Sequence, residues 1–140
     1  EGDYKSVDIC LTTPEEAKYF AEQTGVDALA VAIGTAHGNY AVQPELRIDR
    51  LKEIAEVVNC PLVLHGGTGL TKEDFKNCLA NGIKKINIAT ASYDRVAAKL
   101  KQVAKAKPEA NYFDFSRAAV EATCENIEEH MLVFGLKDRA

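Results

Sequence analysis

The sequence has 140 residues, of which 46% are hydrophobic and 27% charged, and its formal net charge is −4. These proportions are those of packed globular proteins, and they exclude a disordered or collagen-like chain. The slight acidity, with no basic stripe, argues against nucleic acid as a partner. No apolar run approaches the ~20 residues of a membrane-spanning helix, and residues 1–3 lack the basic start of a signal peptide. We therefore expect a cytoplasmic protein with no membrane partner.

The four cysteines stand at positions 10, 60, 78 and 124. They are widely spaced and form no CxxC pair. This pattern predicts reduced structural thiols and argues against a disulfide framework or a cysteine metal site.

The first element expected along the chain is a helix. Thr13 and Glu16 have the spacing of a capping box, and Pro14 stands at the first helical position. Gly25 supplies the left-handed residue that ends such a helix. Residues 28–33 (ALAVAI) then form an apolar run too short for an average helix. Such a run is typical of a strand buried in a parallel sheet.

The same helix-then-strand pattern occurs twice more. Apolar residues recur at helical spacing over 51–58, before a second apolar run at 61–64. A third helix is expected over 71–82 and a third strand over 83–88. Helices that alternate with short buried strands predict an α/β protein with a parallel sheet.

Two further helices are expected towards the end of the chain. One contains the apolar positions of 96–103 and cannot continue past Pro108. The other covers 120–134 and is closed by Gly135. Its apolar stripe is interpreted either as core or as a subunit contact and consists of Val120, Cys124, Ile127, Met131 and Phe134.

Polar residues capable of chemistry follow each expected strand, in segments 34–38 (GTAHG), 65–69 (HGGTG) and 87–90 (NIAT). Because the carboxyl ends of parallel strands form one face, where ligands bind, these segments are expected to converge. His37 and His65 occupy equivalent positions on neighbouring strands, about 5 Å apart. Two such imidazoles could share a divalent metal, for which zinc is the usual occupant, although a single histidine is more often structural. His130, inside the last helix, is expected to be structural.

The glycines of the second segment suit a phosphate. Gly66, Gly67 and Gly69 let the backbone approach a ligand and turn its amides toward an anion, and Thr68 adds a hydroxyl. In (β/α)8 barrels the loops after the last two strands frequently form the phosphate site. A tight strand-to-helix turn explains the glycines alone equally well.

The third segment offers weaker candidates. Asn87 could hydrogen-bond a substrate hydroxyl and Thr90 could contact a phosphate, but a capping or turn role is the alternative for such an asparagine. Lys84 and Lys85 are expected to form a solvated turn.

Three segments, 27–40 (DALAVAIGTAHGNY), 44–70 (PELRIDRLKEIAEVVNCPLVLHGGTGL) and 83–90 (IKKINIAT), resemble the class II, zinc-dependent ketose-bisphosphate aldolases. The similarity runs from about Thr12 to the C-terminus. It implies that residues 1–140 are the C-terminal part of a single TIM (β/α)8 barrel domain, about three βα units plus terminal helices. The N-terminal strands would be absent from this chain, and three strands cannot close a barrel.

The resemblance also implies roles for individual residues. His37 and His65 would be zinc ligands, and a monovalent cation (Na⁺ or K⁺) would lie beside the phosphate. The third zinc histidine and the catalytic aspartate of the family come from an earlier strand, and no such pair occurs here. Glu1 falls close to the family's loop glutamate and is the one catalytic candidate in this chain. The implied substrate-binding residues are Gly38, Gly66, Gly67, Thr68, Asn87, Ala89 and Thr90.

The activity implied is aldol cleavage of fructose or tagatose 1,6-bisphosphate to dihydroxyacetone phosphate and glyceraldehyde 3-phosphate, a reaction of carbohydrate metabolism such as glycolysis. Zinc would act as a Lewis acid toward the ketone oxygen. We expect the chain alone to be inactive and to associate as a homo-oligomer or with a complementing N-terminal segment. One alternative is a non-catalytic half-barrel that assembles with an aldolase subunit. Another is a metal-free phosphate-binding barrel such as an isomerase.

Overall fold

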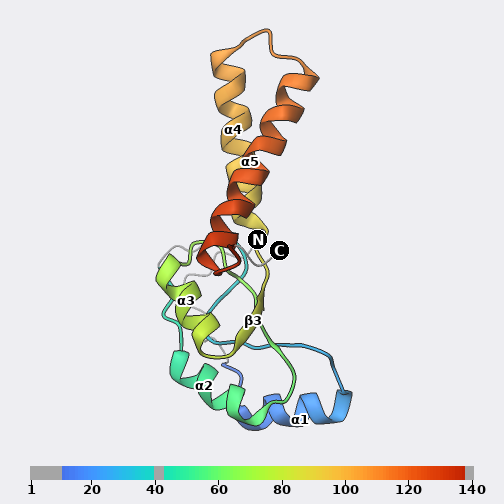
Figure 1. Cartoon of the computed structure of the whole chain (residues 1–140), viewed down its shortest axis with the longest axis vertical. Coiled ribbons are helices and arrows are strands. Elements are labelled where there is room, and N and C mark those ends of the chain that lie inside the picture. The colour runs from blue at the N-terminus through green and yellow to red at the C-terminus, as the bar shows by residue number, and fades with distance from the viewer. Residues whose placement is uncertain (1–10, 40–42, 138–140) are drawn as a thin grey trace. The chain divides into compact units, whose positions relative to one another are not determined.

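The computed structural model describes residues 11–39 and 43–137. The chain forms two compact units, of which the first ends at Ile88 and the second begins at Ala89 (Figure 1). No helix in the described ranges is long and apolar enough to cross a membrane.

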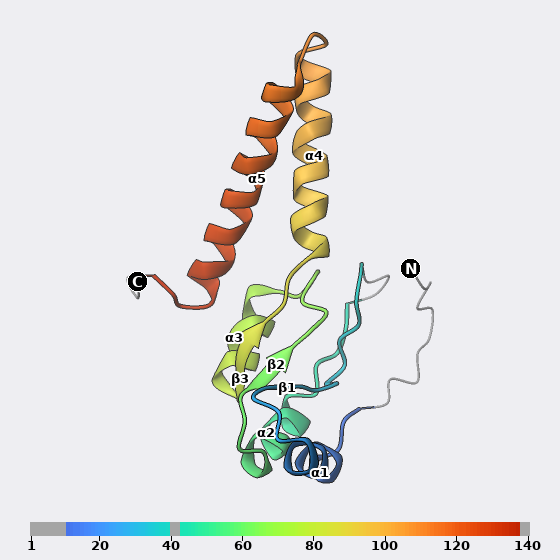
Figure 2. The same cartoon turned by 90° about the vertical axis from the view of Figure 1, so that its right-hand side faces the viewer.

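A three-stranded parallel sheet organises the first unit. Its strands are β1 (Leu29–Ala30), β2 (Leu62–Leu64) and β3 (Ile83–Ile86), side by side in that order (Figure 2). Helices α1 (Pro14–Thr24), α2 (Ile48–Val57) and α3 (Lys72–Ala80) alternate with the strands along the chain. Parallel neighbours need such crossover connections, because a tight turn can join only antiparallel strands. The predicted α/β class with a parallel sheet is confirmed.

Helix α1 begins and ends as its sequence predicts. The Thr13 hydroxyl oxygen accepts a hydrogen bond from the Glu16 N–H at 3.2 Å, and the Glu16 carboxylate accepts one from the Thr13 N–H at 3.0 Å. The bonds that the Thr13 N–H and hydroxyl donate to the Glu16 carboxylate hold the pKa of Glu16 below its ordinary value. Gly25 follows the helix in the left-handed conformation, with φ of 63°, and its N–H donates to the Ala21 carbonyl.

Strand β1 is shorter than the apolar run 28–33 that predicts it. Beyond its second residue the backbone hydrogen bonds go to other segments. The Ala32 N–H donates a hydrogen bond to the Thr12 hydroxyl oxygen at 2.9 Å, and the Ala32 carbonyl accepts one from the Thr12 N–H at 3.0 Å. The Ile33 carbonyl accepts from the Arg47 N–H at 2.9 Å. The run is apolar because it enters the core, while its backbone leaves the sheet.

The core of the first unit lies between the sheet and its helices. Burying each large apolar side chain contributes about 1.5–3 kcal/mol to folding. The largest fully buried side chains come from the strand segments and from α2 and α3, and they are Ile33, Leu51, Ile54, Leu64, Cys78 and Ile83.

The second unit is a hairpin of two helices, α4 (Thr90–Ala106) and α5 (Tyr112–Val133) (Figure 2). Helix α5 begins earlier than the stripe at 120–134 suggests, because the Asn111 side chain caps it by accepting from the N–H groups of Phe113 and Asp114. The helices are joined by the Arg95–Glu129 ion pair at 2.9 Å.

The apolar stripe of α5 is not core. Val120, Ile127 and Met131 are 61%, 49% and 44% exposed. Small side chains, Ala118 and Ala122, are buried on α5 instead, because they let two helix backbones approach closely. These residues are therefore not buried within this chain, and a contact with the rest of the barrel or with another subunit stays a prediction.

The loops after β1 and β2 touch through their backbones. Gly66 has a φ of +68°, and a Cβ placed on it would lie 2.3 Å from the carbonyl oxygen of Ala36. Real atoms do not approach so closely, so only glycine fits at this position without a backbone shift. This contact fixes the distance between the chain segments that carry His37 and His65.

Gly66→Ala is expected to be more destabilising than Gly25→Ala, a matched control. Gly25 has nearly the same positive φ, +63°, but a Cβ placed on it would meet nothing within 4 Å. Strain alone costs about 1–2 kcal/mol in this conformation, and the contact with Ala36 adds about 1–3 kcal/mol of overpacking. Urea denaturation followed by circular dichroism measures both free energies of unfolding. Equal losses would contradict the contact between the loops.

The cysteines of the folded chain are expected to differ in reactivity. Cys78 is 0% exposed, and burial, with a smaller effect of the Asp74 charge, raises its pKa to about 11. Cys124 is exposed. Since the thiolate is the reactive form, a thiol reagent at pH 8 should label Cys124 in the native chain and Cys78 only after unfolding in urea. Peptide mapping by mass spectrometry reads both sites, and equal native labelling would refute the burial of Cys78.

Candidate functional site

The register of the parallel strands brings the chemistry-bearing residues together. Leu64 is paired with Ile86 at the end of β2 and β3. The Asn87 N–H continues the ladder by donating to the Leu64 carbonyl at 3.0 Å. His65 and Asn87 are the residues that directly follow β2 and β3, so they meet at the carboxyl end of the sheet.

His37 joins this pair from the segment after β1. Its ring centroid lies 5.5 Å from that of His65, with the ring planes at 76°. The predicted proximity of the two histidines is confirmed. Both imidazoles border one cavity of about 220 Å³, whose wall is formed by residues 30–32, 35–37, 65 and 66.

Asn87 contacts His65 directly. Its amide nitrogen Nδ2 lies 3.0 Å from Nε2 of the imidazole. On its other side, Lys85 Nζ donates a hydrogen bond to Asn87 Oδ1. The expected turn at Lys84 and Lys85 is wrong, since both residues lie within β3. The missed signal is strand alternation, which puts Lys85 and Asn87, two residues apart, on the same face.

The glycine segment after β2 is tightly packed. A Cβ on Gly67 would lie 3.2 Å from the Phe75 ring and 3.4 Å from the Asn87 carbonyl oxygen. Thr68 is only 8% exposed. Gly38, in contrast, has nothing within 4 Å of a Cβ position. The glycines of this segment therefore form the tight turn after β2. The groups they could offer to an anion such as phosphate are their backbone N–H groups.

Other expected site residues are not brought to the histidine pair by the first unit. Ala89 and Thr90 belong to the second unit, where they are the N-cap and first residue of α4. Glu1 lies outside the described residues. His130 lies in α5, where its Nδ1 is 2.7 Å from the Asn126 carbonyl oxygen, in keeping with its expected structural role.

The described residues supply too few ligands for a complete metal site. Among residues 11–39 and 43–137, no group of three or more His, Cys, Asp or Glu side chains could hold a metal ion. A catalytic zinc usually has three protein ligands and an open position. The histidine pair would therefore need a ligand from elsewhere.

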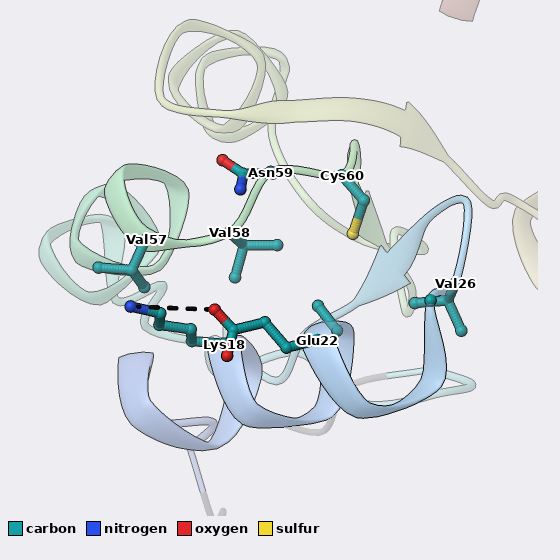
Figure 3. Close-up of a pocket in the computed structure, with 9 residues that line it drawn as sticks. Lys18, Glu22, Val26, Val57, Val58, Asn59 and Cys60 are labelled. Carbon is teal, nitrogen blue, oxygen red and sulfur yellow. Dashed lines mark ion pairs between the residues drawn. The ribbon is translucent and has the colours of Figure 1, made fainter.

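A second cavity of about 280 Å³ lies at the other end of the strands (Figure 3). It is bordered by the end of α1 and by residues 57–60, which lead into β2. Lys18 and Glu22 form an ion pair at 4.0 Å beside it. In parallel barrels this end of the sheet serves stability and the carboxyl end serves catalysis, so the histidine pair marks the candidate site.

Known structures share this fold. The YdjI aldolase from Escherichia coli K12 is 35% identical, with a TM-score of 0.85 over 93% of this chain and 48% of its own. A putative fructose-1,6-bisphosphate aldolase from Coccidioides immitis is 32% identical, with a TM-score of 0.80 over 92% of this chain and 45% of its own. The fructose-bisphosphate aldolase of Campylobacter jejuni is 22% identical and shares the fold, with a TM-score of 0.75 over 96% of this chain and 49% of its own.

The chain spans about half the length of these structures, as expected for the C-terminal portion of a TIM barrel. The family model of the class II fructose-bisphosphate aldolases matches residues 1–139. Sequence, sheet topology and the arrangement of strand ends thus agree, and the chain belongs to the class II fructose-bisphosphate aldolase family.

Proposed function

We propose that this chain supplies two zinc ligands and the phosphate site of an aldolase that cleaves fructose or tagatose 1,6-bisphosphate. The products would be dihydroxyacetone phosphate and glyceraldehyde 3-phosphate. The observation that carries the proposal is the contact of His37 with His65 beside one cavity, in a member of this family. We infer a cytoplasmic enzyme, because widely spaced cysteines without CxxC pairs suit a reducing compartment.

The two imidazoles suit zinc. Rings whose centroids are 5.5 Å apart can both reach one ion at a Zn–N distance of about 2.0–2.1 Å. The third ligand, a histidine, would come from an earlier barrel strand, either of a longer polypeptide or of a complementing segment. Zinc, when bound, supplies a Lewis acid for the ketone oxygen.

The remaining residues would bind and orient the substrate. Backbone amides of Gly66 and Gly67, with Gly38, would hold the phosphate of the dihydroxyacetone portion, and a Na⁺ or K⁺ ion would lie beside it. Asn87 would hydrogen-bond this portion of the substrate. A phosphate held at one end fixes the reacting carbons in place and so lowers the entropic part of the barrier. Thr68, Ala89 and Thr90 would complete the phosphate site.

Proton transfer would depend on residues outside the described part of the chain. The aspartate that acts as acid and base in the family belongs to an earlier strand, and Glu1 stays a prediction. We therefore propose that the active form is a homo-oligomer of a longer chain or a complex with an N-terminal segment. The chain alone should have negligible aldolase activity.

The proposal is tested in a chimera that joins this chain to the part of the Escherichia coli YdjI aldolase that it does not cover. The chimera should bind zinc and cleave a ketose 1,6-bisphosphate. His37→Ala and His65→Ala should each lower zinc affinity by more than about 100-fold. Loss of a residue that only hydrogen-bonds to a metal ligand lowers affinity by up to about 100-fold, and loss of a ligand itself should cost more. Zinc titration with a competing chelator and a coupled cleavage assay measure both quantities.

His130→Ala is the matched control, because it removes an imidazole from α5 and should change neither measurement. Aldol cleavage that survives exhaustive chelation, or zinc retained in both site variants, would refute the zinc mechanism. Tolerance of His37→Ala would favour the metal-free barrel. Stable assembly without zinc or cleavage would favour the half-barrel partner.

A further inference from the structure

The two faces of the three-stranded sheet differ in what covers them. Leu62, Leu64 and Ile83 share one face, and each is at most 2% exposed. They form the core together with buried side chains of α2 and α3. In a (β/α)8 barrel the helices form the outer ring, so this face points outward. The opposite face would point into the barrel interior.

A row of paired residues marks this inner face. Ala30 is paired with Val63, and Val63 is paired with Lys85. Ala30 and Lys85 are exposed in this chain. Ala30 also borders the cavity of the histidine pair, so the inner face lies on the side of the candidate site. Because side chains fill the interior of a closed barrel, Lys85 would be enclosed once the remaining strands are in place.

Lys85 brings a charge to the inner face without a counter-charge. Its Nζ donates a hydrogen bond to the neutral Asn87 Oδ1, and no carboxylate in the described ranges is paired with it. None of the residues of β1, β2 and β3 is acidic. A lysine is almost never fully buried unless it is paired, because an opposite charge must compensate for the loss of water around the ammonium. Enclosure of Lys85 therefore requires a carboxylate that the strands of this chain do not supply.

The remaining strands of the barrel are the partner that fits this requirement. The chain spans only 48% and 45% of the two relatives that are more than 30% identical to it, so the strands that would close the barrel belong to the other half. A second copy of this chain would bring a second Lys85 to the interior and no acidic strand residue. Charge therefore favours strands of a different sequence over self-association.

We propose that the inner face docks on the N-terminal strands of an aldolase barrel and that one of these strands presents an aspartate or glutamate to Lys85. The ammonium–carboxylate pair would join the two halves of the barrel. This carboxylate would differ from the aspartate that moves the proton, because an adjacent ammonium lowers the pKa of a carboxylate and a general base needs a pKa near the working pH. The inference rests on the barrel fold of the family and on neither zinc nor cleavage.

The test mixes the 140-residue chain with a separate polypeptide, the part of the Escherichia coli YdjI aldolase that it does not cover. Isothermal titration calorimetry measures their association without zinc or substrate. The unsubstituted chain should bind. Lys85→Met keeps most of the stem and removes the ammonium, and it should weaken binding by about 100-fold or more, because the carboxylate is left buried and unpaired.

Two variants separate the ion pair from a general effect of charge or stability. Lys85→Arg keeps the positive charge and should retain most of the affinity. Lys52→Met is the matched control, because it removes the same charge from an exposed position of α2, a helix of the outer ring, and should leave binding unchanged. Circular dichroism verifies that each variant is folded.

A zero-length cross-link detects the pair directly. A water-soluble carbodiimide activates a carboxyl group, and the Lys85 amine in contact with it then forms an amide bond, while the carbodiimide leaves as a urea. Peptide mapping by mass spectrometry should find Lys85 joined to an aspartate or glutamate of the other polypeptide. The same peptide names the partner residue.

Three results would overturn the proposal. The first is that the unsubstituted chain does not associate with the other polypeptide. The second is that Lys85→Met binds as tightly as the unsubstituted chain or more tightly, which is the result for an ammonium without a counter-charge. The third is that Lys85 is cross-linked only to its own chain or to a second copy. Since no zinc or substrate is present, these results leave the zinc and cleavage tests of the proposed function unaffected, and failure of those tests leaves the docking result standing.

Discussion

The parallel register of β2 with β3 is the constraint on which the candidate site depends. Pairing Leu64 with Ile86 places the following residues, His65 and Asn87, side by side. Side chains alternate along a strand, so a slip by one residue would turn one of them to the opposite face. The packing of the apolar strand residues sets the register of the strands, and the register sets which polar residues lie next to each other at the carboxyl end of the sheet.

Local signals allowed much of this fold to be predicted from the sequence. The N-cap at Thr13 and the helix end at Gly25 depend on hydrogen bonds between residues three or four positions apart, so both could be predicted from the local sequence. The end of β1 is different, because Thr12 and Arg47 take the hydrogen bonds that would continue the strand. Competition of this kind between distant segments has no local signature.

The site divides in the same way. Proximity of His37 and His65 could be predicted, because both follow strands of the parallel sheet. Their positions are not equivalent, since His65 follows β2 directly and His37 comes seven residues after the end of β1. The engagement of Lys85 with Asn87 was missed, because the lysine pair was interpreted as a solvated turn although a strand was expected over the same residues, 83–88. The stripe of α5 was ambiguous for another reason. Apolar periodicity shows that a helix has an apolar face, but it does not identify what covers that face.

The contact between Gly66 and the Ala36 carbonyl bears on protein design. With no side chain between them, the two backbones are held at van der Waals distance, and a displacement of one loop is passed to the other. To build this histidine pair into another parallel sheet, a design must include both loops that carry the histidines, together with Gly66, as a single unit.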